Sequence, residues 1–478
     1  MTGGNKIEKS LFELIQVAVG NQSALSSVPT QQEWQQLYGL LSNHTLFGIG
    51  YVAIQKLPQE QWPPMMLVLK WTSVATAISR QNKTLNEECK SLCEEFRHDG
   101  VSSVVIKGQS NLENYPEELR WYRTPGDIDL WCEARNGVEV GEMVNGEVVK
   151  SEFHGIAGVI EYCKQYKRCR GRDIPRHRVL YYHCELKSDN GIAIEPHYRI
   201  SYLHSPVRNH RLQKWFKNQF DVCLKNNCQL GFPVLTPSVN VVYQLVHLYR
   251  HVFEGGVGLR QLMDYYFALR VWHNDAMESK DLQSQGMWSE GMGTPVMSKE
   301  EVMAVLKSFG MGKFAAAVMY VLQEAFENEE CLLELEMRNE KLGIERELKE
   351  INRELKEIGP QADEDGEQQL PDTAKLMSTY EISNERIIRR QLKKNNYLPW
   401  MICKPNEREG RRLLAEIMQG GNLGQYDTRD AALKKGGMMK HGVWKLKRVM
   451  RLVSIYPEEA LWEPVFRVYH LLWRGING

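Results

Sequence analysis

The chain has 478 residues, with 60 basic and 60 acidic side chains and a formal net charge of zero. This length predicts about two or three domains, and the composition, 42% hydrophobic and 25% charged, is that of an ordinary soluble globular protein. The balanced charge argues against a protein that coats nucleic acid or binds membranes through a polybasic segment, although a local basic groove is compatible with it.

The chain contains no targeting or membrane signal that we recognise. Its N-terminal segment lacks a long apolar run and a small-residue cleavage site, so we expect no signal peptide. No apolar stretch is long enough for a transmembrane helix. Ten cysteines are scattered without a Cys-x-x-Cys pair, which favours reduced thiols in a cytoplasmic protein over a zinc site.

Residues 1–99 are predicted to be helical. Leu11 and Ile15 belong to a set of apolar residues that recur with a helical period, and residues 34–41 repeat this pattern in a second helix. Residues 66–97 are expected to form one long helix or two. This N-terminal helical region ends at Gly100, where the pattern changes.

Residues 100–235 are predicted to form an α/β core. Short apolar runs bounded by glycine or by a Pro-Gly turn indicate buried strands at 101–106 and 128–132. Residues 179–186 and 191–200 are expected to form a strand pair around an Asp-Asn-Gly turn. The predicted fold class is therefore α+β: a small mixed β-sheet flanked by N-terminal and C-terminal helical regions.

The rest of the chain is divided by composition. Residues 236–325 form a second helical region, within which 277–298 are expected to be a loop because they are rich in Gly, Ser and Met. Residues 326–372 are a charged helix and linker insertion, and the charged helix, 324–358, is a candidate binding surface for a protein partner. Residues 373–478 form a basic and aromatic C-terminal helical region.

Asp127 and Asp129 carry the sharpest chemical signal. Residues two apart on a strand point to the same face, so their carboxylates project side by side while Ile128 faces the core. Two adjacent carboxylates repel one another unless a cation lies between them, and hard divalent ions such as Mg²⁺ prefer oxygen ligands. The alternative is an exposed pair of aspartates in a turn.

Three further features surround this pair. Lys107-Gly108-Gln109-Ser110 follows a strand and precedes an expected helix, a setting in which the Lys107 ammonium, the Gly108 backbone and the Ser110 hydroxyl can contact phosphate. The alternative is a plain strand-to-helix turn. Arg123 offers a fork that matches phosphate, although a surface arginine is equally compatible with the residue type.

Glu195 lies on another apolar strand, where an unpaired carboxylate is costly, so it needs a metal or a salt bridge to an arginine such as Arg199. His197 shares its face, as an auxiliary residue or as a structural histidine.

These residues together resemble the polymerase-β-like nucleotidyltransferase superfamily, and more closely the bacterial family of uncharacterised nucleotidyltransferases often encoded near polysaccharide genes. The matching segments lie within about residues 30–270, and they include 105–108, 115–116, 123–130, 194–198 and the helical stretch with His247, Arg260 and Asp264. The resemblance implies that Asp127, Asp129 and Glu195 bind two Mg²⁺ ions, with Mn²⁺ also possible. Gln109 departs from the superfamily pattern, which has glycine and serine adjacent at this loop.

The resemblance predicts an enzyme that moves a nucleoside monophosphate from a nucleoside triphosphate to a hydroxyl of a sugar, a small molecule or a protein, with a link to polysaccharide metabolism. Asp127, Asp129 and Glu195 are then the catalytic acids, and Lys107, Gly108, Ser110 and Arg123 bind the nucleotide phosphates. Two other functions stay open: a non-catalytic nucleotide- or partner-binding protein on the same fold, and a toxin–antitoxin nucleotidyltransferase.

Overall fold

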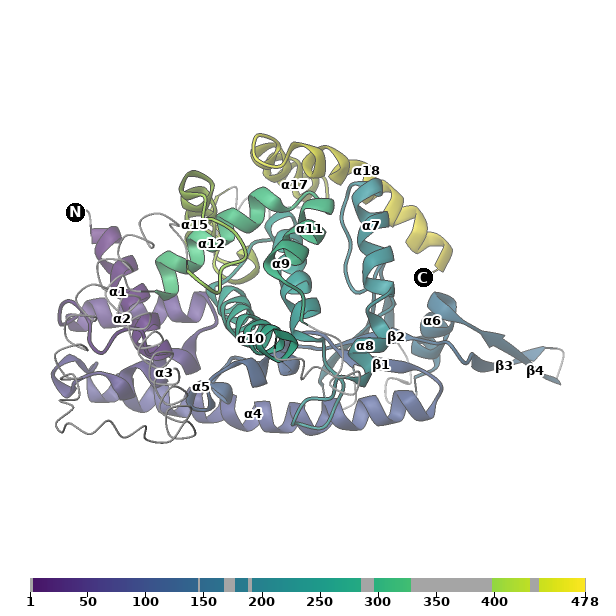
Figure 1. The fold of residues 1–478 in the computed structure, drawn as a ribbon, viewed down its shortest axis with the longest axis horizontal. Helices are drawn as coiled ribbons and strands as arrows, with labels where there is room; N and C mark the ends of the chain where they lie inside the picture. Colours follow the sequence, from purple (N-terminus) through teal and green to yellow (C-terminus); the bar gives the residue numbers. More distant parts are fainter. Residues whose placement is uncertain are drawn as a thin grey trace, which may run out of the picture.

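The structure is a computed structural model that describes residues 3–144, 147–166, 177–187, 191–284, 296–327, 398–429 and 438–477. It is a mixed α+β fold, which confirms the predicted class. Figure 1 shows a sheet to the right of centre, N-terminal helices at the left, and central and C-terminal helices above the sheet. The predicted charged helix at 324–358 falls almost wholly outside the described residues, since helix α12 ends at Phe326.

The N-terminal region is helical, as predicted. Its elements are α1 (Gly3–Val19), α2 (Gln31–Asn43), α3 (Phe47–Lys56), the short 3-10 helix η1 (Gln59–Gln61) and α4 (Met65–His98). Helix α2 begins with a capping box, in which Thr30 and Glu33 bond each other's backbone N–H groups. Residues 65–98 form one helix, which runs beneath the sheet in Figure 1.

The central sheet has five strands in the order β1-β2-β7-β6-β5. Strand β2 is antiparallel to β1 and parallel to β7, and β6 is antiparallel to both β7 and β5. The strands are β1 (Ser102–Val105), β2 (Ile128–Glu133), β5 (His177–Val179), β6 (Cys184–Lys187) and β7 (Ala193–His197). A separate two-stranded ribbon, which the sequence analysis did not predict, consists of β3 (Val138–Val144) and β4 (Glu147–Phe153).

The two faces of the sheet contact different cores. Ile128 and Leu130 of β2 pack with residues of α4 and of α6 (Gly155–Gln165) on one face. Trp131 points to the other face, where its ring meets those of Phe216 and Phe220. Because side chains alternate along a strand, Asp129 shares the face of Trp131.

Helices on the Trp131 face complete the fold. They include α7 (Pro206–Lys217), α8 (Phe220–Lys225), α9 (Pro237–Glu254), α10 (Leu259–Ser284), α11 (Lys299–Ser308), α12 (Gly312–Phe326), α15 (Glu407–Gly420), α17 (Met438–Val453) and α18 (Pro457–Asn477). Two short elements follow strand β1, the 3-10 helix η2 (Gly108–Asn114) and α5 (Glu117–Arg120), and another 3-10 turn is η5 (Asn422–Gly424). None of the described helices is long and apolar enough to cross a membrane.

Two local predictions were wrong. Residues 277–284 are the end of α10 rather than a loop, because this stretch is free of glycine and proline until Gly286 and contains good helix formers. The expected strand at 179–186 is interrupted, since β5 ends at Val179 and β6 begins at Cys184. The helix expected after Lys107 is present, as the 3-10 helix that begins at Gly108.

Candidate active site

The parallel pairing of β2 and β7 brings two acidic residues from distant parts of the chain together. Asp129 lies directly opposite Glu195 in the register, and Ile128 lies opposite Ile194. The two isoleucines are buried in the core beneath the sheet, which fixes the face on which the carboxylates emerge. Asp127 immediately precedes β2 and is exposed, whereas Asp129 is 1% exposed. The prediction that the acids lie on adjacent strands agrees with this geometry.

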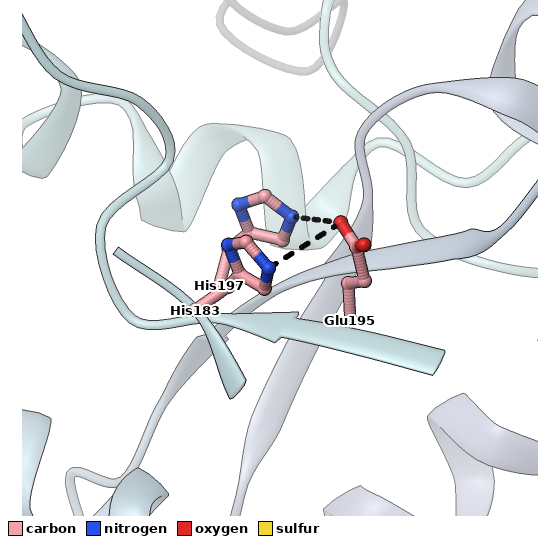
Figure 2. A group of neighbouring side chains, drawn as sticks. All are labelled: His183, Glu195 and His197. Atoms are coloured by element: carbon pink, nitrogen blue, oxygen red, sulfur yellow. Dashed lines mark ion pairs between the residues drawn. The ribbon is translucent and has the colours of Figure 1, made fainter. Parts of the chain in front are cut away.

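Two buried histidines flank the acids. Nε2 of His197 lies 2.9 Å from Oδ1 of Asp129 and 3.6 Å from Oε2 of Glu195. Nε2 of His183 lies 3.8 Å from the same Glu195 oxygen, and the two imidazoles are stacked with centroids 4.9 Å apart. Figure 2 shows both rings facing Glu195. One ligand atom from each of the three residues lies within 4.8 Å of the others, which is close enough for a shared metal ion.

Lys107 supplies the positive charge nearest the acids. Its Nζ lies 2.9 Å from Oδ1 of Asp129 and 4.0 Å from Oε2 of Glu195. Gly108 follows with φ +67°, a backbone conformation that favours glycine, and a Cβ there would lie 3.3 Å from the carbonyl oxygen of Asp127. The turn after β1 therefore passes close to the start of β2, and this contact holds the ammonium against the carboxylates.

The charges in this cluster shift its pKa values in opposite directions. Burial, together with the neighbouring Asp129 and Glu195 carboxylates, raises the pKa of Asp127 to about 6. Burial also acts to raise the pKa of Asp129, but Lys107 and His197 outweigh it and hold that pKa well below its usual range. The Asp129 carboxylate is thus fully ionised and has cationic and hydrogen-bond-donating neighbours. The negative charge of Asp127, in contrast, is opposed by the like charges of its neighbours.

A cavity of about 230 Å³ opens beside the acids, and its far wall is formed by α9 and α10. Helix α9 presents His247, Arg250, His251 and Glu254 at intervals of three and four residues, which places them on one helical face. Burial lowers the pKa of His251 to about 3, so its imidazole is neutral near pH 7. The Arg250 guanidinium lies over the ring of Tyr182, 4.4 Å from its centroid.

Of the two arginines on this wall, Arg260 of α10 has the positive charge that its negatively charged neighbours balance less well. Burial, followed by the nearby positive charge of Arg123, lowers its pKa to about 10. Its Nη1 donates to the Thr124 carbonyl oxygen at 2.8 Å, while Nε is buried and has no hydrogen-bond partner among the described residues. A bound anion would stabilise such a guanidinium.

Two predicted phosphate-binding residues lie in different settings from those expected. Arg123 is 3% exposed, and its Nε and Nη2 donate to the two oxygens of Asp264 at 2.6 and 2.7 Å. Because this ion pair is bidentate and buried, the Arg123 guanidinium is held by Asp264 of α10. The Ser110 hydroxyl is buried within η2, and Ser110 is not among the residues that line the cavity, whereas Lys107 and Gly108 are. No contact supports the prediction for Ser110.

The alternative predicted for Glu195, a salt bridge to Arg199, is absent among the described ion pairs. Arg199 instead donates to the Tyr181 carbonyl oxygen and lies over the rings of Tyr181 and Trp473. Glu195 therefore has Lys107 and the histidines as its neighbours.

A family model described as an uncharacterised nucleotidyltransferase matches residues 30–286, more than half of the chain. The chain belongs to this family. The matched region includes α2, the whole central sheet and the α9–α10 wall. Every residue that lines the cavity lies within it, except Leu423. Neither the curated proteins nor the solved structures contain a significant match.

Sequence reasoning missed His183 and most of the α9 wall. His183 lies between β5 and β6, in a stretch whose apolar and aromatic residues gave no indication of a break. The α9 residues did leave a signal: His247, Arg250, His251 and Glu254 form a titratable stripe on a helix that is mostly apolar and almost wholly buried. A charged stripe on a buried helix needs partners, and here it meets the cavity.

Proposed function

We propose that this chain is a metal-dependent nucleotidyltransferase that transfers a nucleoside monophosphate from a nucleoside triphosphate to a hydroxyl acceptor. The observation that carries the proposal is the pairing of Asp129 with Glu195 on adjacent parallel strands, with Asp127 beside them at the mouth of a cavity. Family membership makes nucleotidyl transfer the expected activity class.

The donor set suits divalent cations. Three carboxylates face one lysine. Burial and then the repulsion of Asp129 and Glu195 raise the pKa of Asp127, and a bound cation would relieve that repulsion. Carboxylate oxygens fit Mg²⁺, while the adjacent imidazoles of His183 and His197 make Mn²⁺ an equally suitable ion. We propose Asp127, Asp129 and Glu195 as the residues that hold two such ions. When bound, the ions would lower the pKa of the acceptor hydroxyl and neutralise charge on the leaving pyrophosphate.

The opposite wall of the cavity supplies positive charge for the triphosphate. The positive charge of Arg260 is buried and is not fully balanced by nearby negative charge. Lys107, which directly precedes the Gly108 turn, holds its ammonium group against the acids. We propose that these two side chains contact phosphate oxygens directly. Arg123 acts as a positioning residue in this scheme, because its bond to Asp264 ties the segment before Asp127 to α10, from which Arg260 also projects.

The chain's own groups then do three things. The β2 and β7 carboxylates orient the reacting centre, the α9–α10 wall holds the anionic leaving group, and His197 keeps Asp129 fixed through the 2.9 Å contact. Positioning and electrostatic stabilisation of this kind dominate phosphoryl chemistry. The acceptor is a sugar, a small molecule or a protein hydroxyl, and a role in polysaccharide metabolism is part of the proposal. The protein is proposed to act in the cytoplasm, and a protein partner at residues 324–358 remains a further proposal.

Asp129→Asn tests the proposal. The purified chain is incubated with each of the four ribonucleoside triphosphates and Mg²⁺ or Mn²⁺, and pyrophosphate release is measured. We expect the variant to lose on the order of a thousandfold in rate, because the amide cannot replace a metal-binding carboxylate. Asp221→Asn, at an exposed aspartate paired with Arg135 outside the cavity, is the matched control and should retain full activity.

Calorimetry with the same nucleotides separates this enzyme from the alternatives. Tight metal-dependent binding without turnover indicates a non-catalytic nucleotide-binding protein. If none of the four nucleotides gives a binding signal, both the proposed enzyme and the nucleotide-binding alternative are contradicted. A mass increase on a co-expressed protein or RNA identifies the acceptor and favours the toxin–antitoxin reading.

A further inference from the structure

An ordinary surface helix exposes its charged residues and buries its apolar ones, whereas helix α18 exposes apolar residues. Every exposed residue between positions 461 and 476 is uncharged. Five of them form a continuous stripe with exposed fractions from 55% to 83%, which we call the α18 outer stripe: Leu461, Val465, Val468, Leu472 and Ile476. Their spacing of four, three, four and four residues places them on one face of the helix.

Two charged residues of α18, Glu459 and Glu463, are buried on its inner side instead. Glu459 is 1% exposed and accepts hydrogen bonds from the backbone N–H groups of His204 and Ser205. Glu463 is buried and forms an ion pair with Arg467 one turn along. The inner face is thus fixed to the protein by charge, and the apolar outer face has no protein contact among the described residues that would bury it. Apolar patches of this extent mark interaction sites.

The surroundings of the stripe are basic. Helix α7, which lies beside α18 in Figure 1, has four basic residues and no acidic one. A cavity of about 450 Å³ separates the two helices, and Trp462, Val465 and Tyr469 of α18 line it together with Asn209 and His210 of α7. Residues 438–477, which contain α17 and α18, have seven basic residues against three acidic ones, although the whole chain is neutral.

The exposed cations lie on the flanks rather than in the stripe. Lys214 and Lys217 of α7 are exposed, and neither forms an ion pair among the described residues. Helix α17 exposes Lys440 and Lys447 on the same side as Val443, Leu446 and Met450. The arrangement is an uncharged apolar strip on α18, with tryptophan and tyrosine at its border and exposed lysines on the adjacent helices α7 and α17.

We infer that the α7–α17–α18 surface docks onto an anionic lipid membrane, with the α18 outer stripe inserted at the level of the headgroups. Interfacial helices combine these features: an apolar face with aromatic residues, and cations that attract acidic headgroups. A second copy of the chain is a poorer occupant, because a two-fold contact brings together two copies of the same basic surface. This inference does not depend on the proposed catalytic function.

Vesicle sedimentation of the full chain tests the inference. The chain should pellet with vesicles that contain phosphatidylglycerol and remain in solution with vesicles of phosphatidylcholine alone, and raised salt should weaken the binding. Val468→Glu combined with Leu472→Glu should reduce binding roughly tenfold or more, because it places charge in the apolar strip. Met65→Glu combined with Met66→Glu, at two exposed methionines of α4, is the matched control and should bind as the wild type does.

Charge reversal provides the second arm. Lys214→Glu with Lys217→Glu should weaken phosphatidylglycerol binding by roughly fivefold for each lysine, whereas Lys83→Glu with Lys90→Glu on α4 should leave it unchanged. Circular dichroism verifies that each variant is folded. Failure of the wild type to pellet with acidic vesicles overturns the inference. So does a wild-type dimer in light scattering that Val468→Glu with Leu472→Glu converts to monomer, since the stripe is then a self-association surface.

Discussion

The Lys107 ammonium lies 2.9 Å from the Asp129 carboxylate at the centre of the candidate site, in the place where a cation is needed. The nearby carboxylates raise the pKa of Lys107 although burial alone lowers it, so the side chain is charged at neutral pH. Lys107 therefore stabilises the protein when no metal is bound, and it competes with metal ions for the same oxygen. Replacing Lys107 therefore tests both its stabilising effect and its competition with metal ions.

Lys107→Met should destabilise the metal-free protein by about 3 kcal/mol, because it leaves the buried Asp129 charge without its main partner. Added Mg²⁺ or Mn²⁺ should then raise the melting temperature more in the variant than in the wild type, since the ion replaces the lost cation. Thermal unfolding with and without the ions measures both effects. An equal metal-induced shift in the two proteins would show that Lys107 and the ions do not share a site.

Glu195→Gln should abolish nucleotidyl transfer while leaving the fold intact. The amide keeps the shape of the side chain but cannot hold a divalent ion, so we expect a loss on the order of a thousandfold in kcat. Glu139→Gln is the matched control, because Glu139 lies on strand β3, is exposed and pairs with Lys150 away from the cavity. Pyrophosphate release under saturating nucleotide gives both rates. Comparable losses in the two variants would remove Glu195 from the catalytic set.

The strands that position the acids were predictable because they are short apolar runs with clear turn signals. β1 and β7 lie within the predicted ranges, and β2 extends one residue beyond its predicted range. The i, i+2 spacing correctly put the Asp129 carboxylate on the face of the strand opposite to Ile128. The pairing of Asp129 with Glu195 followed from the family resemblance, because a local pattern does not specify which strands are neighbours.

The rest of the site required three-dimensional contacts. His183 faces Glu195 only because the chain breaks between β5 and β6, and neither glycine nor proline marks that break. Arg123 looked like a free phosphate ligand, since its partner Asp264 is 141 residues away. The strand pair β3–β4 was missed because its glycine and acidic residues weaken the alternating pattern that identifies a strand.

Arg260→Gln should separate nucleotide binding from stability. The lowered pKa of Arg260 shows that folding buries its charge at a cost, so replacing it by a neutral amide should leave the metal-free melting temperature unchanged or raise it. The same change should weaken nucleoside triphosphate binding by roughly tenfold to a hundredfold, because a charge-assisted contact to phosphate is lost. Calorimetry and thermal unfolding of one sample measure the two quantities. A lower melting temperature with unaltered nucleotide binding would make Arg260 a structural residue.

Glu327, at the end of α12, should make stability depend on pH. Its carboxylate is buried and accepts hydrogen bonds from Tyr266 and Asn21, and burial raises its pKa from 4.5 to about 7 despite the opposing charge of Arg270. The folded state therefore binds the proton more tightly than the unfolded state. Its stabilising contribution is complete below about pH 4.5, declines as the pH rises, and is lost above about pH 7.

Glu327→Gln should remove this dependence, because the amide is neutral at every pH and its oxygen can still accept the hydrogen bond from Tyr266. We expect the wild type to lose about 3 kcal/mol from this group between pH 4.5 and pH 7, and the variant to lose none of it. At pH 8 the variant should be the more stable protein, whereas at pH 5 the two should be similar. Urea unfolding across this range gives the difference in free energy at each pH. If that difference is constant with pH, the Glu327 carboxylate does not change its protonation on unfolding.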